Sequence, residues 1–326
     1  MSSNDGRGVP QVERAFAPIF SQQAEVTDPV ASGGAPPEVA RTRVASIKTY
    51  RYLRLGMLVT VAALTAAIVG ASAGESGLLT SLSAYYYTPA RAVYDGGLFA
   101  IGLSLNAIKG RNAFEDFCLN LAGMLAPLVA LVPTTDRGGK EVALLQADLD
   151  AAANNVQAIL IAGFFATLLA VGVTALDQRN GELASDRTAL RARVALLVLT
   201  VVTLAAVTYV FAAHRDFFLE HAHGKSAFVM FGVLALASVG NGVVHLRGGS
   251  RAYAVTYLGI GIAMVGVGCL MVIGSLDGWE RRTLWVEMIE IALFAALWTV
   301  QTWELWGEVV PRPETSTVVR RSTSPT

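Results

Sequence analysis

Two carboxylates one helical turn apart begin the last long apolar stretch of the chain. Glu287 and Glu290 are three positions apart, so in a helix they share a face, which also carries Phe294 and Gln301. Ionisable side chains are costly inside a bilayer and mark binding sites when they occur there. The alternative is that Glu287 sits in water at the start of its helix, where the helix dipole favours a negative charge.

A second charged pair, Arg91 and Asp95, begins an earlier apolar stretch. In a helix the pair shares a face with Gly102 and Asn106, and this face is expected to line the interior of a bundle or a water-filled crevice. Two interpretations stay open. The pair binds a ligand, or it is a local ion pair that satisfies only itself.

Three of the four histidines gather between two apolar stretches. His214, His221 and His223 are expected in one loop, together with Asp216 and Glu220. Imidazole and carboxylate groups are zinc ligands, so His221 and His223 with a carboxylate are candidates for binding a zinc ion. The spacing matches no recognised zinc motif, and solvated histidines are the alternative.

The elements that must position these residues are long apolar segments, which predict an all-α, polytopic membrane helix bundle. Mean hydropathy is +0.50 and 15% of the residues are charged, against roughly 25% in soluble domains. A bilayer core of about 30 Å needs about 20 apolar residues in a helix. About eight segments qualify, at residues 53–73, 91–109, 114–133, 156–175, 193–213, 226–245, 252–274 and 284–306.

The distribution of positive charge predicts the orientation of these segments. With the N-terminus inside, 18 of the 25 lysines and arginines fall on the inner side, which predicts that both termini are cytoplasmic. The polar stretches 1–48 and 309–326 predict disordered cytoplasmic tails around a transmembrane domain at 49–308. Ala-, Gly-, Val- and Arg-rich composition is typical of a GC-rich bacterial genome, so we expect the bacterial cytoplasmic (inner) membrane.

Small residues at every fourth position predict close helix contacts. One such stripe is formed by Gly96, Ala100 and Ser104, and another by Gly259 and Ala263. The formal net charge is zero, which suggests no nucleic-acid partner. The expected partners are therefore the lipid bilayer and a lipid or small polar ligand.

A block of residues before the second apolar segment resembles a known family. The stretch Ser81-Leu-Ser-Ala-Tyr-Tyr-Tyr-Thr-Pro-Ala-Arg91 is followed by a G-x-L-x-A-I-G helix at 96–102, a V-P-T turn at 132–134, an H-x-x-S-A element at 223–227 and a W-x-E start at 285–287. These motifs resemble a family of bacterial multi-pass membrane proteins, the domain of unknown function 998 group. The family pattern has an apolar residue where Asp95 stands and a lysine around Gln301.

The resemblance implies that Ser83, Tyr86, Arg91, His223 and Glu287 are shared positions, and it implies no reaction. By depth, the polar groups fall in the outer third of the bundle and would converge on one pocket. The candidate ligand-binding residues are Ser83, Tyr86, Arg91, Asp95, Glu287 and Glu290.

Three functions follow as alternatives, and whether the chain is an enzyme stays open. The first is binding or transport of a lipid or small polar ligand in the outer pocket. The second is a zinc-dependent membrane lipid hydrolase, in which a metal-bound water attacks an amide or ester. The third is a scaffold or assembly protein whose main property is tight helix packing.

Overall fold

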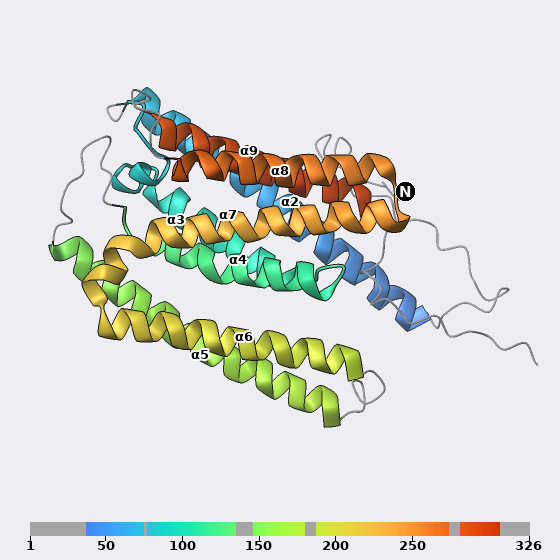
Figure 1. Ribbon diagram of the computed structural model, residues 1–326. Helices are drawn as coiled ribbons and strands as arrows, with labels where there is room; N and C mark the ends of the chain where they lie inside the picture. Colours follow the sequence, from blue (N-terminus) through green and yellow to red (C-terminus); the bar gives the residue numbers. More distant parts are fainter. Residues whose placement is uncertain (1–36, 75–76, 135–145, 180–186, 274–280, 307–326) are drawn as a thin grey trace, which may run out of the picture. The chain divides into compact units, whose positions relative to one another are not determined.

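The computed structural model describes residues 37–74, 77–134, 146–179, 187–273 and 281–306. Within these ranges the chain is all-α and contains no strand (Figure 1). It divides into two units, Met1–Ala45 and Ser46–Thr326, and every contact reported below lies in the second. The predicted tails fall outside the described residues at 1–36 and 307–326.

Eight α-helices and one short 3₁₀ helix make up the described chain. Seven α-helices are long and apolar enough to cross a membrane, which makes this a multi-pass membrane protein. The exception is α3, whose 17 residues span about 25 Å, less than a bilayer core of about 30 Å. The elements are α2 (Pro37–Ala73), η2 (Ser83–Tyr87), α3 (Arg91–Ala107), α4 (Ala113–Leu131), α5 (Gln146–Arg179), α6 (Arg187–Ala213), α7 (Arg215–Gly248), α8 (Arg251–Val272) and α9 (Arg282–Glu304).

Several helices begin earlier than the predicted segments, among them α5, which begins at Gln146 instead of residue 156. Helix α2 begins at Pro37, inside the predicted tail, and proline is well tolerated in the first turn of a helix. Helix α7 begins at Arg215, so His221 and His223 lie in a helix and the predicted loop is wrong. The first turns of α7 are amphipathic, and Phe218 packs edge-to-face on Phe211 of α6, at 5.5 Å between ring centroids. A search of the sequence for runs of about 20 apolar residues does not detect this extension, because one of its faces is polar.

Close helix packing occurs at glycines other than the predicted stripes. A Cβ on Gly123 of α4 would lie 2.7 Å from the carbonyl oxygen of Gly102 on α3. On α8, a Cβ on Gly261 would lie 2.8 Å from the carbonyl oxygen of Ala235 on α7. By contrast, Gly96 and Gly259 face open space, so the stripes built on them do not mark these contacts.

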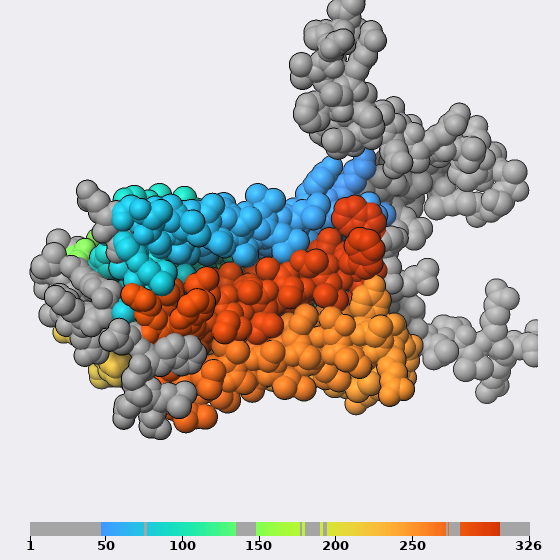
Figure 2. Space-filling view, turned by 90° about the horizontal axis from the view of Figure 1, so that it is seen from above, coloured from blue at the N-terminus to red at the C-terminus, as the bar shows by residue number. Residues whose placement is uncertain are grey.

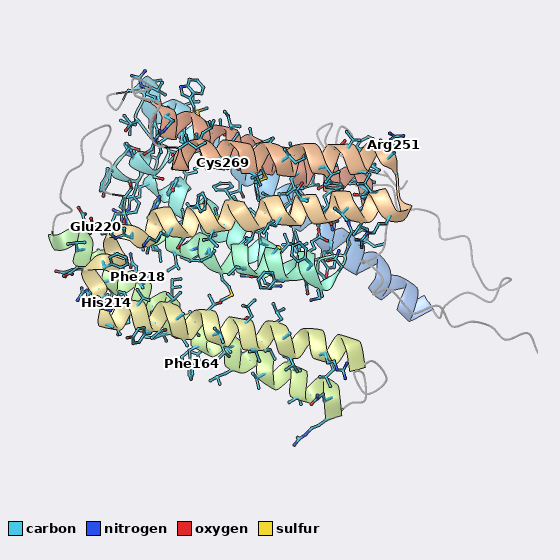
Figure 3. The ribbon with its side chains drawn as sticks, in the orientation of Figure 1. Phe164, His214, Phe218, Glu220, Arg251 and Cys269 are labelled. Carbon is cyan, nitrogen blue, oxygen red and sulfur yellow. The ribbon has the colours of Figure 1, made fainter. Side chains whose placement is uncertain are left out.

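The buried core is formed mainly by α2, α3, α4, α7, α8 and α9, together with η2 and with Ala152, Ala153 and Val156 near the start of α5. Trp298, Tyr257, Met57 and Leu105 are among its largest fully buried side chains. In the space-filling view α2, α9 and α8 form adjacent bands (Figure 2). The apolar parts of α5 and α6 are instead exposed, as Phe164 illustrates (Figure 3). Apolar helix faces of this kind are suited to contact lipid.

Candidate functional site

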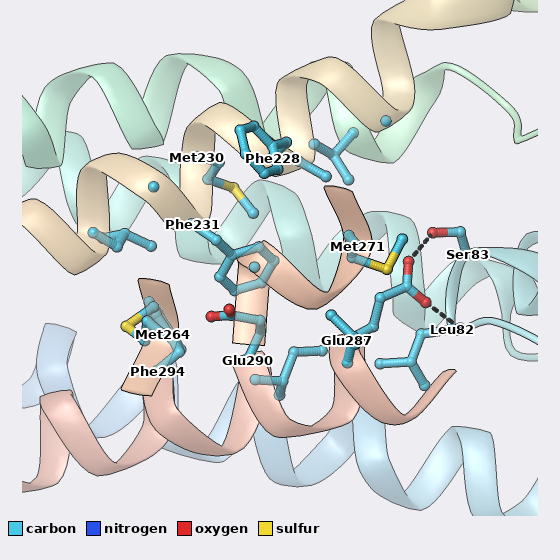
Figure 4. A pocket seen from close by; sticks show the side chains of 18 of the residues that line it. Leu82, Ser83, Phe228, Met230, Phe231, Met264, Met271, Glu287, Glu290 and Phe294 are labelled. Atoms are coloured by element: carbon cyan, nitrogen blue, oxygen red, sulfur yellow. Dashed lines mark hydrogen bonds between the residues drawn. The ribbon is translucent and has the colours of Figure 1, made fainter. Parts of the chain in front are cut away.

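The bundle encloses an elongated cavity of about 460 Å³ between α2, η2, α3, α7, α8 and α9 (Figure 4). Its lining on α3 extends from Tyr94 to Leu105, which corresponds to about 16 Å of helix. Most of the lining side chains are apolar, with Phe231, Met264 and Phe294 among them. The volume falls in the range of cavities that hold small-molecule ligands.

Polar side chains from three elements meet at one end of the cavity, which we call the polar end: Ser83, His223 and Glu287. The hydroxyl of Ser83 lies 2.8 Å from Oε1 of Glu287, and the Leu82 N–H donates to Oε2 at 2.6 Å (Figure 4). On the other side of Ser83, Nε2 of His223 lies 2.7 Å from the hydroxyl oxygen. The ring is oriented by a hydrogen bond of 2.9 Å from Nδ1 to the carbonyl oxygen of Val132. Ser83 and His223 are both buried.

The polar end is positioned by the short 3₁₀ helix η2, which begins at Ser83. Tyr85 anchors η2 because its ring is fully buried and its hydroxyl bonds to Ser72 of α2 and to the carbonyl of Gly77. The N–H of Leu284 donates to the carbonyl of Thr80 at 2.9 Å, which fixes the start of α9 beside the same segment. Ser83 and Glu287 are therefore placed by backbone contacts as well as by their own bond.

The hydrogen bonds around Ser83 need one proton more than a neutral histidine and an ionised glutamate supply. The carbonyl of Val132 only accepts, so Nδ1 of His223 carries a hydrogen. Ser83 has one hydroxyl hydrogen, yet it bonds to both Nε2 of His223 and Oε1 of Glu287. The additional hydrogen is on Nε2 of His223 or on Oε1 of Glu287.

Glu290 lies one turn deeper in the cavity than Glu287. It is 4% exposed, and its Oε2 has no hydrogen-bond partner among the described residues. Figure 4 shows its carboxyl group directed toward Phe231 and Met264, away from the Ser83–Glu287 bond. The predicted shared face is confirmed, since Phe294 and Gln301 are buried with Glu290 along α9.

The cavity opens to the molecular surface along α7 and α8. Phe228 of α7 and Val265 of α8 line the cavity and are nevertheless 55% and 48% exposed. Gly224 and Gly232 of α7 and Cys269 of α8 also line it and are exposed. We call this side opening the mouth. The residues around the mouth are apolar or glycine.

The other predicted ligand-binding residues form a separate group beside η2. Arg91 stacks on the Tyr86 ring at 4.0 Å, hydrogen-bonds to the Tyr86 hydroxyl and lies 3.5 Å from Asp95. None of these three residues lines the cavity. Burial raises the pKa of the Tyr86 hydroxyl although Arg91 acts in the opposite direction, so Tyr86 remains a neutral hydrogen-bonding group. The described contacts favour the local ion pair over a shared pocket with Glu287.

The two candidate zinc ligands point in different directions. His221 is bonded within its own helix, with Nδ1 2.9 Å from the carbonyl of Phe217, whereas His223 faces Ser83. Residues two apart on a helix lie on opposite sides. Among the described residues, no group of three or more His, Cys, Asp or Glu side chains is placed to hold a metal ion. Zinc binding stays a prediction for direct metal analysis.

A second network, which is partly buried and which the sequence did not predict, lies at the opposite end of the bundle. Arg111 forms a two-point ion pair with Glu304, with one N–O distance of 2.8 Å, and donates to the Tyr257 hydroxyl at 2.9 Å. His245 lies 2.8 Å from Glu304 and stacks on Tyr257. The four side chains come from the α3–α4 connection, α7, α8 and α9.

Glu115 extends this network into the core. Its carboxylate accepts hydrogen bonds from the Arg111 backbone at 2.6 Å, from Asn241 at 2.8 Å and from Gln301 at 2.6 Å. Glu115 also lies in the first turn of α4, where its N–H donates to the side-chain oxygen of Asn112 at 2.9 Å. In the sequence, the predicted shared face of Glu287, Glu290 and Gln301 on the last helix is the one pattern that indicates a polar contact here.

Comparisons with family models, with curated proteins and with solved structures gave no match.

Proposed function

We propose that this chain binds an amphiphile, placing its apolar part in the cavity and a polar group at Ser83, His223 and Glu287. The observation that carries the proposal is a cavity of about 460 Å³ with an apolar wall and hydrogen-bonding groups gathered at one end. A ligand with an apolar body and one polar group matches both regions. The apolar mouth along α7 and α8 provides entry from the lipid phase.

We place the polar end on the outer side of a bacterial cytoplasmic membrane that is crossed eight times, with both termini inside. The positive-charge asymmetry supports this orientation. Asp150 near the start of α5 lies 3.4 Å from Arg215 at the start of α7, and His223 of α7 meets Val132 at the end of α4. These contacts bring the end of α4 and the starts of α5 and α7 to one side, as expected when successive helices cross in alternating directions. In this arrangement α3 is a short eighth crossing.

A reporter fused to the C-terminus tests this topology. Cytoplasmic activity of a fused fluorescent protein, together with no activity of a fused periplasmic phosphatase, is the expected result. A phosphatase-active fusion at the C-terminus would overturn the eight-pass arrangement.

Ligand binding is tested by filling the cavity. Gly268 lines it, and a Cβ there would have only Glu290 nearby, at 3.9 Å, so Gly268→Leu projects into the cavity without a backbone clash. Gly259→Leu on the same helix is the matched control, because Gly259 is exposed and faces open space. The measurement is the amount of lipid or other amphiphile that co-purifies with each variant, by mass spectrometry.

We expect the Gly268→Leu variant to lose the co-purifying amphiphile and the Gly259→Leu variant to retain it. Equal amounts in both variants and the unaltered protein would mean that the cavity is not the binding site.

Acyl-ester hydrolysis is a second candidate, favoured by the 2.7 Å separation of the Ser83 hydroxyl and Nε2 of His223. With Nδ1 protonated and the additional hydrogen on Oε1 of Glu287, Nε2 can take the Ser83 proton while the hydroxyl oxygen attacks an ester carbonyl. The proton would then pass from His223 to the departing alcohol, and water would release the acyl group. Labelling by a fluorophosphonate tests this activity: it must occur in the unaltered protein and disappear in both Ser83→Ala and His223→Gln.

A further inference from the structure

We propose that the amphiphile is a cation, with Glu290 as its counter-charge inside the cavity. The ligand class is an apolar organic ammonium, and this inference rests on the proposed binding function. Glu290 is placed about 4.5 Å deeper than Glu287 along α9. The ammonium group would therefore sit one turn below Glu287, at the inner edge of the polar end, with the apolar chain of the ligand beyond it in the cavity.

The unpartnered carboxyl group of Glu290 is the first observation behind this assignment. A buried polar atom without a hydrogen bond costs about 1–3 kcal/mol, and native proteins keep few of them. Oε2 of Glu290 is such an atom, in a residue that is 4% exposed and lines the cavity. An ammonium group in the cavity would give this oxygen its missing partner.

The charges of the cavity wall are the second observation. Its ionisable side chains are Glu287, Glu290, His223, Tyr94 and Cys269, and none of the described lining residues is Lys or Arg. An anionic ligand would face two glutamates without a permanent counter-charge. A cation meets a carboxylate in a wall of low dielectric, where opposite charges attract more strongly than in water.

Aromatic side chains complete the environment expected for an organic cation. Phe228, Phe231 and Phe294 line the cavity, and Figure 4 shows Phe231 and Phe294 on either side of Glu290. The faces of aromatic rings attract ammonium groups, most strongly where water is excluded. Met230 and Met264 supply adaptable apolar surface beside them.

A matched pair of ligands separates charge from apolar binding. Decyldimethylamine, protonated at pH 8 and so carrying one N–H, is the cationic probe, and decyldimethylamine N-oxide at the same pH is its uncharged counterpart. The full-length protein is reconstituted in lipid nanodiscs, binding of each radiolabelled probe is measured at equilibrium, and uptake by empty nanodiscs is subtracted. The variants are Glu290→Gln and, as a control for net charge, Glu220→Gln, which changes an exposed glutamate outside the cavity.

We expect the unaltered protein to bind the cation at least about tenfold more tightly than the N-oxide, which corresponds to about 1.4 kcal/mol. Glu290→Gln should remove this preference and still bind the N-oxide, which also confirms that the variant is folded. Glu220→Gln should leave both affinities unchanged.

The outcomes distinguish this inference from the proposed function. Binding of both probes with equal affinity, or a cation preference that survives in Glu290→Gln, would overturn the assignment of a cationic ligand and leave amphiphile binding in place. If neither probe binds the unaltered protein, amphiphile binding by this cavity falls as well.

Discussion

Arg111 and Glu304 are 193 positions apart in the chain and form a two-point ion pair at the end of the bundle opposite Ser83. The pair links the α3–α4 connection to the last turn of α9. Tyr257 and His245 bond to the same carboxylate, so α7 and α8 are joined to it as well. This network closes one end of the bundle, whereas the cavity lies toward the other.

Removing one partner of the Arg111–Glu304 ion pair should destabilise the fold more than removing both partners. Arg111→Met should lower the free energy of unfolding by up to about 3 kcal/mol, because it leaves the partly buried Glu304 carboxylate without its arginine counter-charge. The double variant Arg111→Met/Glu304→Met should be more stable than the single one. Thermal unfolding in detergent, followed by circular dichroism, measures the difference. Equal destabilisation of the single and double variants would contradict the coupling.

The proton count at the polar end predicts that Glu287→Gln is tolerated. The glutamine amide can donate to the Ser83 oxygen while its carbonyl accepts from the Leu82 N–H, so Ser83 is free to donate to His223. Glu287→Ala should instead cost about 1–3 kcal/mol, because it leaves the Leu82 N–H without a partner. Unfolding midpoints of the two variants provide the test. A Glu287→Gln variant as unstable as Glu287→Ala would contradict this count of hydrogens around Ser83.

Glycine substitutions should distinguish the real helix contacts from the predicted stripe. Gly123→Ala must push α3 and α4 apart, because its Cβ would meet the Gly102 carbonyl at 2.7 Å. Gly96→Ala meets nothing and should stabilise α3 by about 0.5–1 kcal/mol through the helix preference of alanine. Unfolding midpoints should therefore shift in opposite directions. Equal tolerance of both substitutions would argue against the α3–α4 contact.

The two cysteines should differ in reactivity with a maleimide. Cys269 is exposed at the mouth, whereas Cys118 is buried in the core, and both are free. In the folded protein only Cys269 should be alkylated, and Cys118 should react after denaturation. An amphiphile in the cavity should slow alkylation of Cys269, and mass spectrometry of the labelled peptides measures both effects. Labelling of Cys118 at the same rate as Cys269 would contradict this packing.

The cavity site was only partly predictable. The pattern of α9 correctly placed Glu287 and Glu290 on one buried face, because helical periodicity relates residues within one segment. The sequence does not place His221, because a polar-faced helix start such as that of α7 resembles a loop in composition. A shared depth in the membrane predicts that Arg91 meets Glu287, and the structure keeps the two apart. Depth fixes one coordinate of a side chain and leaves the rotation of its helix undetermined.

The sequence by itself determined that this is a helical membrane protein, because the length of an apolar segment is set by the bilayer and needs no partner. Only the tertiary structure decided which polar groups meet. Ser83 reaches Glu287, and Arg111 reaches Glu304, through the way η2 folds back onto α9 and through helix crossings at glycines such as Gly102 and Gly123. Those contacts depend on the packing of segments that are distant in the chain, and no local pattern encodes that packing.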